Sequence, residues 1–336
     1  MESDITATDE GRGRFTYHGG DLAAARSAYP GAPEPWVDLS TGINPIPYAV
    51  PSLPMDAWAA LPSAAAARAL EAAAARAYGA EPDNIVGAPG TEALIQWLPR
   101  LHRARRVGVL GFTYGDHARS WRSAGAEVDV VDDLAALEGY DVAVVVNPNN
   151  PDGRLVEPDA LVRLARRVGL LVVDEAFADV VSSDWSLATR PPPNGLVLRS
   201  FGKFFGLAGL RLGFAVTATD RATSLRAAFG PWAVSGPAVA VGTRAFADDV
   251  WASSSLTRLA QDAGRLDVLL RDAGAVLVGG TTLYRLAEFD DAAGTFDALA
   301  HAGLLTRPFA ERPRWLRFGL PVDEAAWQRL SGALRR

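Results

Sequence analysis

The sequence predicts an α/β protein with a mostly parallel central sheet, helices on both faces of that sheet, and a smaller α+β domain at the C-terminus. Two patterns lead to this fold class. Through the middle of the chain, short runs rich in Val and Leu alternate with helical segments, as in parallel sheets that are buried on both sides. After Gly236 the order changes to long helices followed by weaker strands.

The expected elements follow one another along the chain. A helix begins near Pro62 in PSAAAARALEAAAARAYGA, which is rich in the best helix former and ends at Gly79. PDALVRLARRVG is a second expected helix, and long helices are expected from Gly236 to Gly274. The strands of the large sheet are expected in RVGVLG, AEVDVVD, YDVAVVVN, GLLVVDEA, GLVLRS and RLGFAV, and those of the small domain around AVLVGG, LYRLAEF and RWLRFGL.

These patterns divide the chain into four parts. Residues 1–14 are polar and lack hydrophobic periodicity, so we expect a disordered leader there. Residues 15–44 are expected to form an N-terminal arm that joins the small domain. The large domain is then expected over residues 45–236 and the small C-terminal domain over residues 237–336.

Composition limits the classes of function. With 336 residues, of which 49% are hydrophobic and 21% charged, the chain can bury a large core. A net charge of -6 provides no basic field for nucleic acid. The absence of cysteine excludes disulfides, thiolate nucleophiles and zinc–thiolate sites, and we expect no metal. An acidic N-terminus and the lack of a run of about 18 apolar residues predict neither a signal peptide nor a membrane partner, and hence a cytoplasmic protein.

One of the 33 basic residues is a lysine, Lys203, in the stretch RSFGKFFGLAGLRLG. Arginine cannot replace lysine where chemistry needs a neutral primary amine, because the guanidinium stays charged. The neighbours Phe201, Phe204 and Phe205 are apolar, and desolvation among them would favour the neutral amine. These observations favour a reactive amine over a surface cation that escaped an arginine-biased composition.

Two turns before or between the expected strands carry residues that could contact a ligand. In GAPGTEALIQWL a glycine turn opens a helix, so the N–H groups of Gly90, Thr91 and Glu92 either face an anion or form an ordinary helix cap. In GFTYGDH, Tyr114 is either a packed loop residue or a ring that stacks on a ligand, and His117 follows three residues on.

Two further turns come directly after expected strands. VVVNPNNPDGR places Asn150 in a turn that is unusually rich in Pro and Asn. LLVVDEAFAD places Asp174 at the carboxyl end of a buried strand, where a carboxylate is costly unless it is paired.

In this order and spacing, the motifs from about Gly90 to Gly213 resemble the fold type I family of pyridoxal phosphate enzymes, the aspartate aminotransferase superfamily. The resemblance implies this fold, a pyridoxal 5'-phosphate cofactor and an imine bond between the cofactor and Lys203. It further implies catalytic roles for Lys203, Asp174 and Tyr114. The implied cofactor contacts are Gly90, Thr91, Glu92, Ser200 and Arg211 at the phosphate, Tyr114 against the pyridine ring, Asn150 at the phenolic oxygen and Asp174 at the pyridine nitrogen.

The chain departs from the family pattern at two positions. Phe177 stands where aminotransferases commonly have a tyrosine that donates to the phenolic oxygen, which would leave Asn150 as the donor. Leu61 stands where many relatives have a tyrosine that touches the cofactor phosphate of the neighbouring subunit. The family also implies a homodimer, and the change at Leu61 weakens one contact of it.

The ends of the chain narrow the resemblance. YHGGD, DLSTGINPIPY, GPWAVSGPA and LLTRPFAERPRWLRFGLP together resemble the threonine-phosphate decarboxylases of cobalamin biosynthesis. This implies decarboxylation of a phosphorylated amino acid, L-threonine O-3-phosphate, to 1-aminopropan-2-yl phosphate. The implied substrate-binding residues are His18, Gly42, Asn44, Asn150, Arg307 and Arg317, of which the arginines suit carboxylate and phosphate groups.

Two alternatives stay open. A histidinol-phosphate-type aminotransferase would share the fold and a phosphorylated substrate. A non-catalytic pyridoxal phosphate-binding module, as in some transcription regulators, would need a DNA-binding segment, and no basic or helix-turn-helix segment precedes the fold. For any one arginine the alternative is an ordinary solvated surface charge; this is expected for Arg312 and Arg314, whereas Arg317 lies inside a strand-like run.

Overall fold

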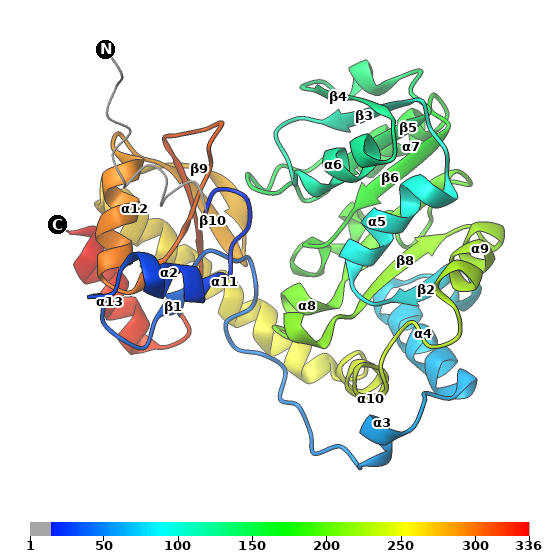
Figure 1. The fold of residues 1–336 in the computed structure, drawn as a ribbon, viewed down its shortest axis with the longest axis horizontal. Coiled ribbons are helices and arrows are strands. Elements are labelled where there is room, and N and C mark those ends of the chain that lie inside the picture. The colour runs from blue at the N-terminus through cyan, green and yellow to red at the C-terminus, as the bar shows by residue number, and fades with distance from the viewer. Residues whose placement is uncertain (1–14, 336) are drawn as a thin grey trace. The chain divides into compact units, whose positions relative to one another are not determined.

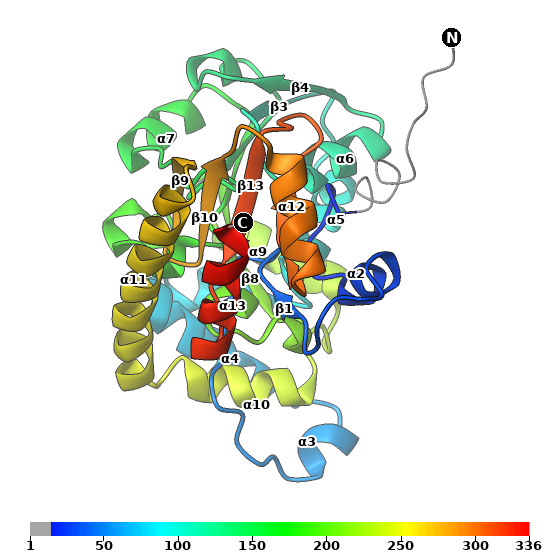
Figure 2. The same cartoon turned by 90° about the vertical axis from the view of Figure 1, so that its left-hand side faces the viewer.

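The computed structural model describes residues 15–335, which form two compact units. Unit 1 consists of the chain up to Ile46 and from Ser255 onward, and unit 2 is Pro47–Ser254. Figures 1 and 2 show the chain from two directions. The leader expected over residues 1–14 lies outside the described residues.

The compact units divide the chain at other places than the expected domains, whose boundaries were 44/45 and 236/237. Helix α10 (Gly236–Ala245) contacts α4 (Ala64–Tyr78) and α3 (Asp56–Ala59), both of which belong to unit 2. The second division therefore falls later, within helix α11 (Asp249–Asp272). The sequence of α10 reads like the helices that follow it, and only its packing assigns it to unit 2.

Unit 2 is built on a seven-stranded sheet with the order β2-β8-β7-β6-β5-β3-β4. Strand β8 runs antiparallel to both of its neighbours, and the other pairs are parallel. The predicted mostly parallel sheet is confirmed, and β2 is a strand that the sequence patterns did not predict. The strands are β2 (Ile85–Ala88), β3 (Arg106–Leu110), β4 (Glu127–Val131), β5 (Val142–Val146), β6 (Leu170–Asp174), β7 (Gly195–Ser200) and β8 (Gly213–Thr217).

Both faces of this sheet are covered. Helices α5 (Thr91–Leu101) and α6 (Asp116–Ser123), drawn in front of the sheet in Figure 1, share a core with alternate strand residues such as Val144 and Val172. Val145 and Val173, which point to the other face, are fully buried as well. The remaining helices of unit 2 are α7 (Pro158–Ala165), α8 (Phe201–Phe204) and α9 (Thr219–Phe229), with short 3-10 turns at Pro82–Asn84, Ala135–Leu137, Ala178–Val180, Ser183–Trp185 and Ala208–Leu210.

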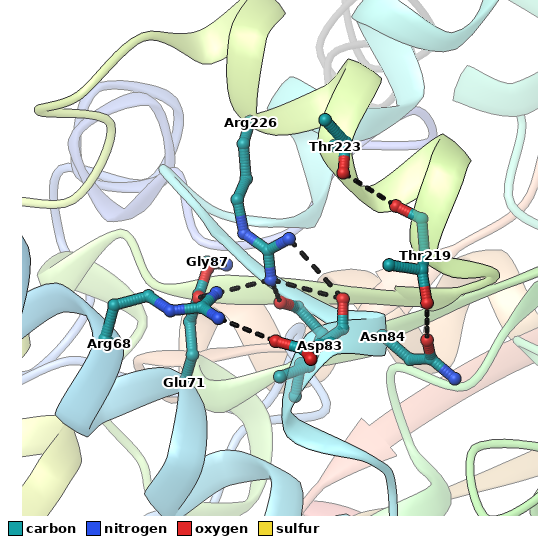
Figure 3. A network of polar contacts seen from close by, with 9 residues as sticks. Arg68, Glu71, Asp83, Asn84, Gly87, Thr219, Thr223 and Arg226 are labelled. Carbon is teal, nitrogen blue, oxygen red and sulfur yellow. Dashed lines mark hydrogen bonds and ion pairs between the residues drawn. The ribbon is translucent and has the colours of Figure 1, made fainter.

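A polar network fixes the edge strand β2 between two helices (Figure 3). Glu71 of α4 accepts a hydrogen bond from Gly87 N at 3.1 Å and pairs with Arg68 at 2.8 Å and with Arg226 of α9 at 3.3 Å. Arg226 also donates to Ile85 O at 2.5 Å. The strand that leads into the Gly90 turn is thus held by side chains as well as by its ladder to β8.

Unit 1 contains an antiparallel four-stranded sheet in the order β12-β13-β10-β9. The three strands expected in the small domain are present as β9 (Val276–Thr281), β10 (Tyr284–Glu288) and β13 (Trp315–Gly319). The N-terminal segment joins this unit through a parallel pair, β1 (Val37–Asp38) with β11 (Leu304–Leu305). Helices α12 and α13 lie side by side in Figure 2, and the unit is completed by α2 (Leu22–Ala28), α12 (Ala292–His301), α13 (Glu324–Leu334) and β12 (Arg307–Pro308).

Within residues 15–335 no helix has the length and apolar character needed to cross a membrane. The same residues contain no group of three His, Asp or Glu side chains close enough together to hold a metal ion.

Candidate active site

Three candidate segments of unit 2 meet at one end of the sheet. Gly213, the first residue of β8, lies opposite Ala88 of β2 on one side and Ser200 of β7 on the other. The Gly90 turn follows Ala88, and Arg211 precedes Gly213. The register of two strand pairs therefore brings together residues that lie far apart in the sequence.

The Gly90 turn leaves no room for a side chain. Gly90 has a φ of 87°, which favours glycine, and a Cβ atom there would lie 2.5 Å from Nη2 of Arg211. A Cβ atom on Gly213 would lie 2.6 Å from the backbone N of Thr91. The Arg211 guanidinium is thus held beside the first turn of α5, where backbone N–H groups and the helix dipole also favour an anion.

Arg211 is held in a strained backbone conformation. Its φ is 54°, and within residues 15–335 every other residue with a positive φ is a glycine. A left-handed conformation costs a residue with a side chain about 1–2 kcal/mol. Such strain persists where the surroundings enforce it, often at functional sites, and here it directs the guanidinium toward Gly90.

Asp174 ends β6 and is 3% exposed. Its Oδ2 lies 2.8 Å from Nε2 of His117, and its Oδ1 accepts a hydrogen bond from Ala176 N at 3.0 Å. This pairing compensates the desolvation of the carboxylate. The sequence placed His117 near Tyr114 without a role, and the fold shows that it orients Asp174.

Tyr114 connects the Gly90 turn with Asp174. Its hydroxyl donates to Oε2 of Glu92 at 3.3 Å, and its ring meets that of His117 edge-on with centroids 6.3 Å apart. Burial, followed by the neighbouring Asp116 carboxylate, raises the pKa of Tyr114 well above its usual value. The phenol therefore stays neutral and can donate a hydrogen bond.

Lys203 lies in the short helix α8 that follows Ser200. Phe201, Phe204 and Phe205 are buried around it, and the lysine itself is half-buried. Its Nζ lies 5.8 Å from the centroid of the Phe177 ring. The aromatic side chain that replaces the tyrosine of many aminotransferases thus faces the single lysine of the chain.

The turn after β5 is held in place by hydrogen bonds of its asparagine side chains. Asn147 exchanges hydrogen bonds with the backbone of Val156, at 3.1 and 2.8 Å. Asn149 accepts from Thr113 Oγ1 at 2.6 Å and donates to Phe112 O at 3.0 Å, which ties this turn to the Tyr114 loop. Asn150, the last asparagine of this turn, is 9% exposed.

Two candidate arginines of unit 1 lie side by side. Arg307 of β12 is the register partner of Arg317 of β13. Arg317 is 3% exposed and donates to Ser40 O at 2.6 Å, and Arg307 donates to Tyr17 O at 2.6 Å. Burial, and then the charge of Arg307, lower the pKa of Arg317 to about 9. Two guanidinium groups side by side create a positive electrostatic potential, which attracts an anion.

The N-terminal candidates also lie in unit 1. His18 is exposed, and its ring packs edge-on against Tyr17 with centroids 4.3 Å apart. Gly42 and Asn44 are buried. Asn44 Oδ1 accepts hydrogen bonds from Arg258 Nη2 at 2.7 Å and from Ile46 N at 3.1 Å. No pattern in the sequence points to Arg258, because a helix of unit 1 brings it to Asn44 from a distant part of the chain.

Comparison with known proteins identifies the family of this chain. Residues 43–334 match the family Aminotransferase class I and II. A threonine-phosphate decarboxylase of Pseudomonas aeruginosa is 44% identical over 324 residues, which cover 94% of this chain and 96% of that protein. Another, from Sinorhizobium sp, is 44% identical over 327 residues and covers 95% of this chain and 97% of its own length.

The fold has close counterparts among solved structures. The crystal structure of histidinol-phosphate aminotransferase from Sinorhizobium meliloti in complex with pyridoxal-5'-phosphate aligns with a TM-score of 0.83, covering 99% of this chain and 97% of that one. The two sequences are 20% identical, so this likeness is one of fold. The family match over residues 43–334 and the two near full-length relatives show that this chain belongs to the class I and II aminotransferase family.

Proposed function

We propose that the chain is a pyridoxal phosphate-dependent decarboxylase that converts L-threonine O-3-phosphate to 1-aminopropan-2-yl phosphate in cobalamin biosynthesis. The observation that carries this proposal is the pair Arg307 and Arg317 on adjacent strands. A substrate with a phosphate and a carboxylate presents two anionic groups, which two such cations can bind. The 44% identity to threonine-phosphate decarboxylases over nearly the whole chain supports the same choice.

The residues of unit 2 fit pyridoxal phosphate. The space above Gly90 that a Cβ atom would fill is bounded by the Arg211 guanidinium, as a phosphate site requires. Thr91, Glu92 and Ser200 would complete that site with backbone N–H and hydroxyl donors. Asp174, buried and oriented by His117, would accept a hydrogen bond from the pyridine nitrogen, and Asn150 would donate to the phenolic oxygen.

When bound, the cofactor supplies an electron-accepting ring for the pair left by the broken carbon–carboxylate bond. Asp174 would keep the pyridine nitrogen protonated, and Tyr114 would offer an aromatic face and a neutral hydroxyl. Lys203 would hold the cofactor between turnovers, and its free, protonated amine would deliver a proton to the substrate α-carbon.

In unit 1, Arg317 and Arg307 bind the substrate anions and so fix the orientation of the substrate. His18, Gly42 and Asn44 complete this set in the proposal. Asn44 is oriented by Arg258, and Gly42 leaves space for a close approach of the substrate.

The homodimer implied by the family is also proposed here. Several large apolar side chains of unit 2 are exposed in the single chain. They are Met55 (73%), Trp58 (64%), Leu61 (67%) and Trp232 (57%). Exposed apolar side chains of this size favour self-association, which light scattering on the purified chain would measure. The cytoplasmic location and the absence of a nucleic-acid partner stay predictions.

The test is incubation of the purified chain and pyridoxal phosphate with L-threonine O-3-phosphate, with and without 2-oxoglutarate. We expect release of carbon dioxide and an equal amount of 1-aminopropan-2-yl phosphate, independent of 2-oxoglutarate. Turnover of histidinol phosphate that needs 2-oxoglutarate, without carbon dioxide release, would favour the aminotransferase. Cofactor binding without turnover of either substrate would favour a binding module.

A further inference from the structure

A buried ion pair lies directly beside two of the proposed cofactor residues. Glu175 follows Asp174 at the end of β6, and Arg199 precedes Ser200 at the end of β7. Arg199 Nη1 lies 3.2 Å from Oε2 of Glu175. Glu175 is 0% exposed and Arg199 is 5% exposed, so both charges are removed from water.

The pair belongs to a cluster on the face of the sheet away from the site. Glu175 accepts hydrogen bonds from Ser186 Oγ at 2.5 Å and from Leu187 N at 2.7 Å. Arg199 donates to Asp179 Oδ1 at 2.8 Å, and its guanidinium lies 4.1 Å from the centroid of the Tyr78 ring. Because side chains alternate along a strand, Asp174 and Ser200 point to the other face, where Asp174 meets His117.

The ion pair lies where the backbone hydrogen bonds between β6 and β7 end. Asp174 and Leu198 are the last register partners of β6 and β7, and Glu175 N donates to Leu198 O at 2.9 Å. Strand ends fray when nothing beyond the ladder holds them. The Glu175–Arg199 contact lies at this point and joins the two strand ends.

Stability alone is a poor explanation for these charges. A buried ion pair is often no more stabilising than apolar residues of similar size, because both charges must be desolvated. The neighbouring positions of β6 and β7 are filled by Val and Leu, which pack without charges. The position of the pair at the two strand ends is better explained if Glu175 and Arg199 hold these ends in a defined geometry.

We propose that Glu175 and Arg199 are positioning residues that fix the end of β6 against the end of β7, and thereby set the Asp174 carboxylate relative to Ser200 and Lys203. The inference rests on the proposed function, because Asp174, Ser200 and Lys203 share one task only if the chain binds pyridoxal phosphate. The cofactor would contact Asp174 of β6 at its pyridine nitrogen, and Ser200 of β7 and Lys203 of α8 at its phosphate and aldehyde.

The test compares Glu175→Gln with wild type in the full chain loaded with pyridoxal phosphate. Two readouts other than activity are measured: the cofactor dissociation constant, and the pH midpoint of the visible absorbance. We expect the dissociation constant to rise about 10- to 100-fold, the range seen when outer hydrogen-bond partners of a bound group are removed. We also expect the midpoint to move, and Glu175→Asp, which keeps the charge, to lie between the two.

Asp267→Asn is the matched control. Asp267 of α11 is also a mostly buried acid that pairs with an arginine, since its Oδ1 lies 2.6 Å from Nε of Arg285. It belongs to unit 1 and lies next to none of the proposed cofactor residues. We expect this variant to lose folding stability while keeping the cofactor dissociation constant and the absorbance midpoint of the wild type.

The outcomes separate the hypotheses. If Glu175→Gln melts earlier but binds cofactor with wild-type affinity and absorbance, the ion pair is only structural and the inference is overturned. If Glu175→Gln does not fold, Ser186→Ala decides by the same readouts, since it removes the hydrogen bonds of the Ser186 hydroxyl to Glu175, Arg199 and Ala188 N and keeps both charges. A wild-type chain that binds no pyridoxal phosphate would instead overturn the proposed function.

Discussion

The two units differ in the partners that surround their buried charged side chains. In unit 2, Asp174 lies 2.8 Å from His117 and Glu175 lies 3.2 Å from Arg199, so each acid faces a basic side chain. In unit 1, Arg317 lies opposite another arginine and donates to Ser40 O at 2.6 Å. The buried acids of unit 2 thus have basic partners within the chain, whereas the two neighbouring arginines of unit 1 repel each other and attract an incoming anion.

The largest expected effect tests the lysine of unit 2. Lys203→Ala should abolish the covalent link to the cofactor and its visible absorbance, and turnover should fall by about a million-fold, as for other covalent catalysts that lose their nucleophile. Borohydride reduction followed by mass spectrometry measures the link. Because the chain has one lysine, wild-type labelling can fall only on Lys203 or the N-terminal amine. Labelling confined to the N-terminus would contradict the assignment.

A second change removes the acid of unit 2 while keeping its shape. Asp174→Asn should lower kcat about 100- to 10,000-fold, because an amide does not keep the pyridine nitrogen protonated. Steady-state kinetics with L-threonine O-3-phosphate measure this loss. Asp129→Asn, at a surface carboxylate bonded to Tyr140, is the control and should retain wild-type kcat. Equal rates in both variants would make Asp174 a structural residue.

The third change should have opposite effects on stability and function. Arg317→Met should weaken substrate binding by about 2–5 kcal/mol, a loss of about 30-fold or more. The same variant without ligand should be as stable as wild type or more stable by about 1–4 kcal/mol, since a buried charge is replaced by an apolar side chain. Substrate titration and urea unfolding measure the two effects. Arg314→Met, which removes an exposed ion pair with Asp290, should change neither.

The pH dependence of folding stability tests whether Arg317 of unit 1 is a desolvated charge in the free protein. Because the pKa of Arg317 is lowered to about 9, the folded chain binds fewer protons than the unfolded chain above that pH. The cost of this buried charge is fully present below pH about 9 and decreases as pH rises toward the usual arginine value. Urea unfolding of wild type and Arg317→Met should therefore converge above pH about 9. A constant difference across this range would show that Arg317 is not desolvated in the free protein.

The smallest expected effect concerns the strained cation of unit 2. Arg211→Gly relieves the positive φ and should leave the unfolding free energy unchanged or raise it by about 1 kcal/mol. The cofactor should nevertheless bind about 10- to 100-fold more weakly, because a charge-assisted contact to its phosphate is lost. Equilibrium titration of the apo chain with pyridoxal phosphate measures this. Wild-type affinity would mean that the strain serves another purpose.

The sequence by itself determined the sheet of unit 2 and the nature of its chemistry. Uninterrupted Val and Leu runs identify β5 and β6 because a strand buried on both faces tolerates little else. The single lysine among phenylalanines and the acid after a buried strand are predicted to be reactive groups, because their apolar neighbours in the sequence predict a desolvated environment. Strand β2 was not predicted, since its four residues include a glycine and give no clear period.

Only the tertiary structure decided which residues act together. Three side-chain contacts join residues that are far apart in the sequence. They are His117 with Asp174 (57 residues apart), Arg199 with Glu175 (24 residues apart) and Arg258 with Asn44 (214 residues apart). The division within α11 and the strain at Arg211 likewise depend on packing. Local patterns record what each segment prefers, but side-chain pairing depends on strand order and register, which arise when the segments bury their apolar faces against one another.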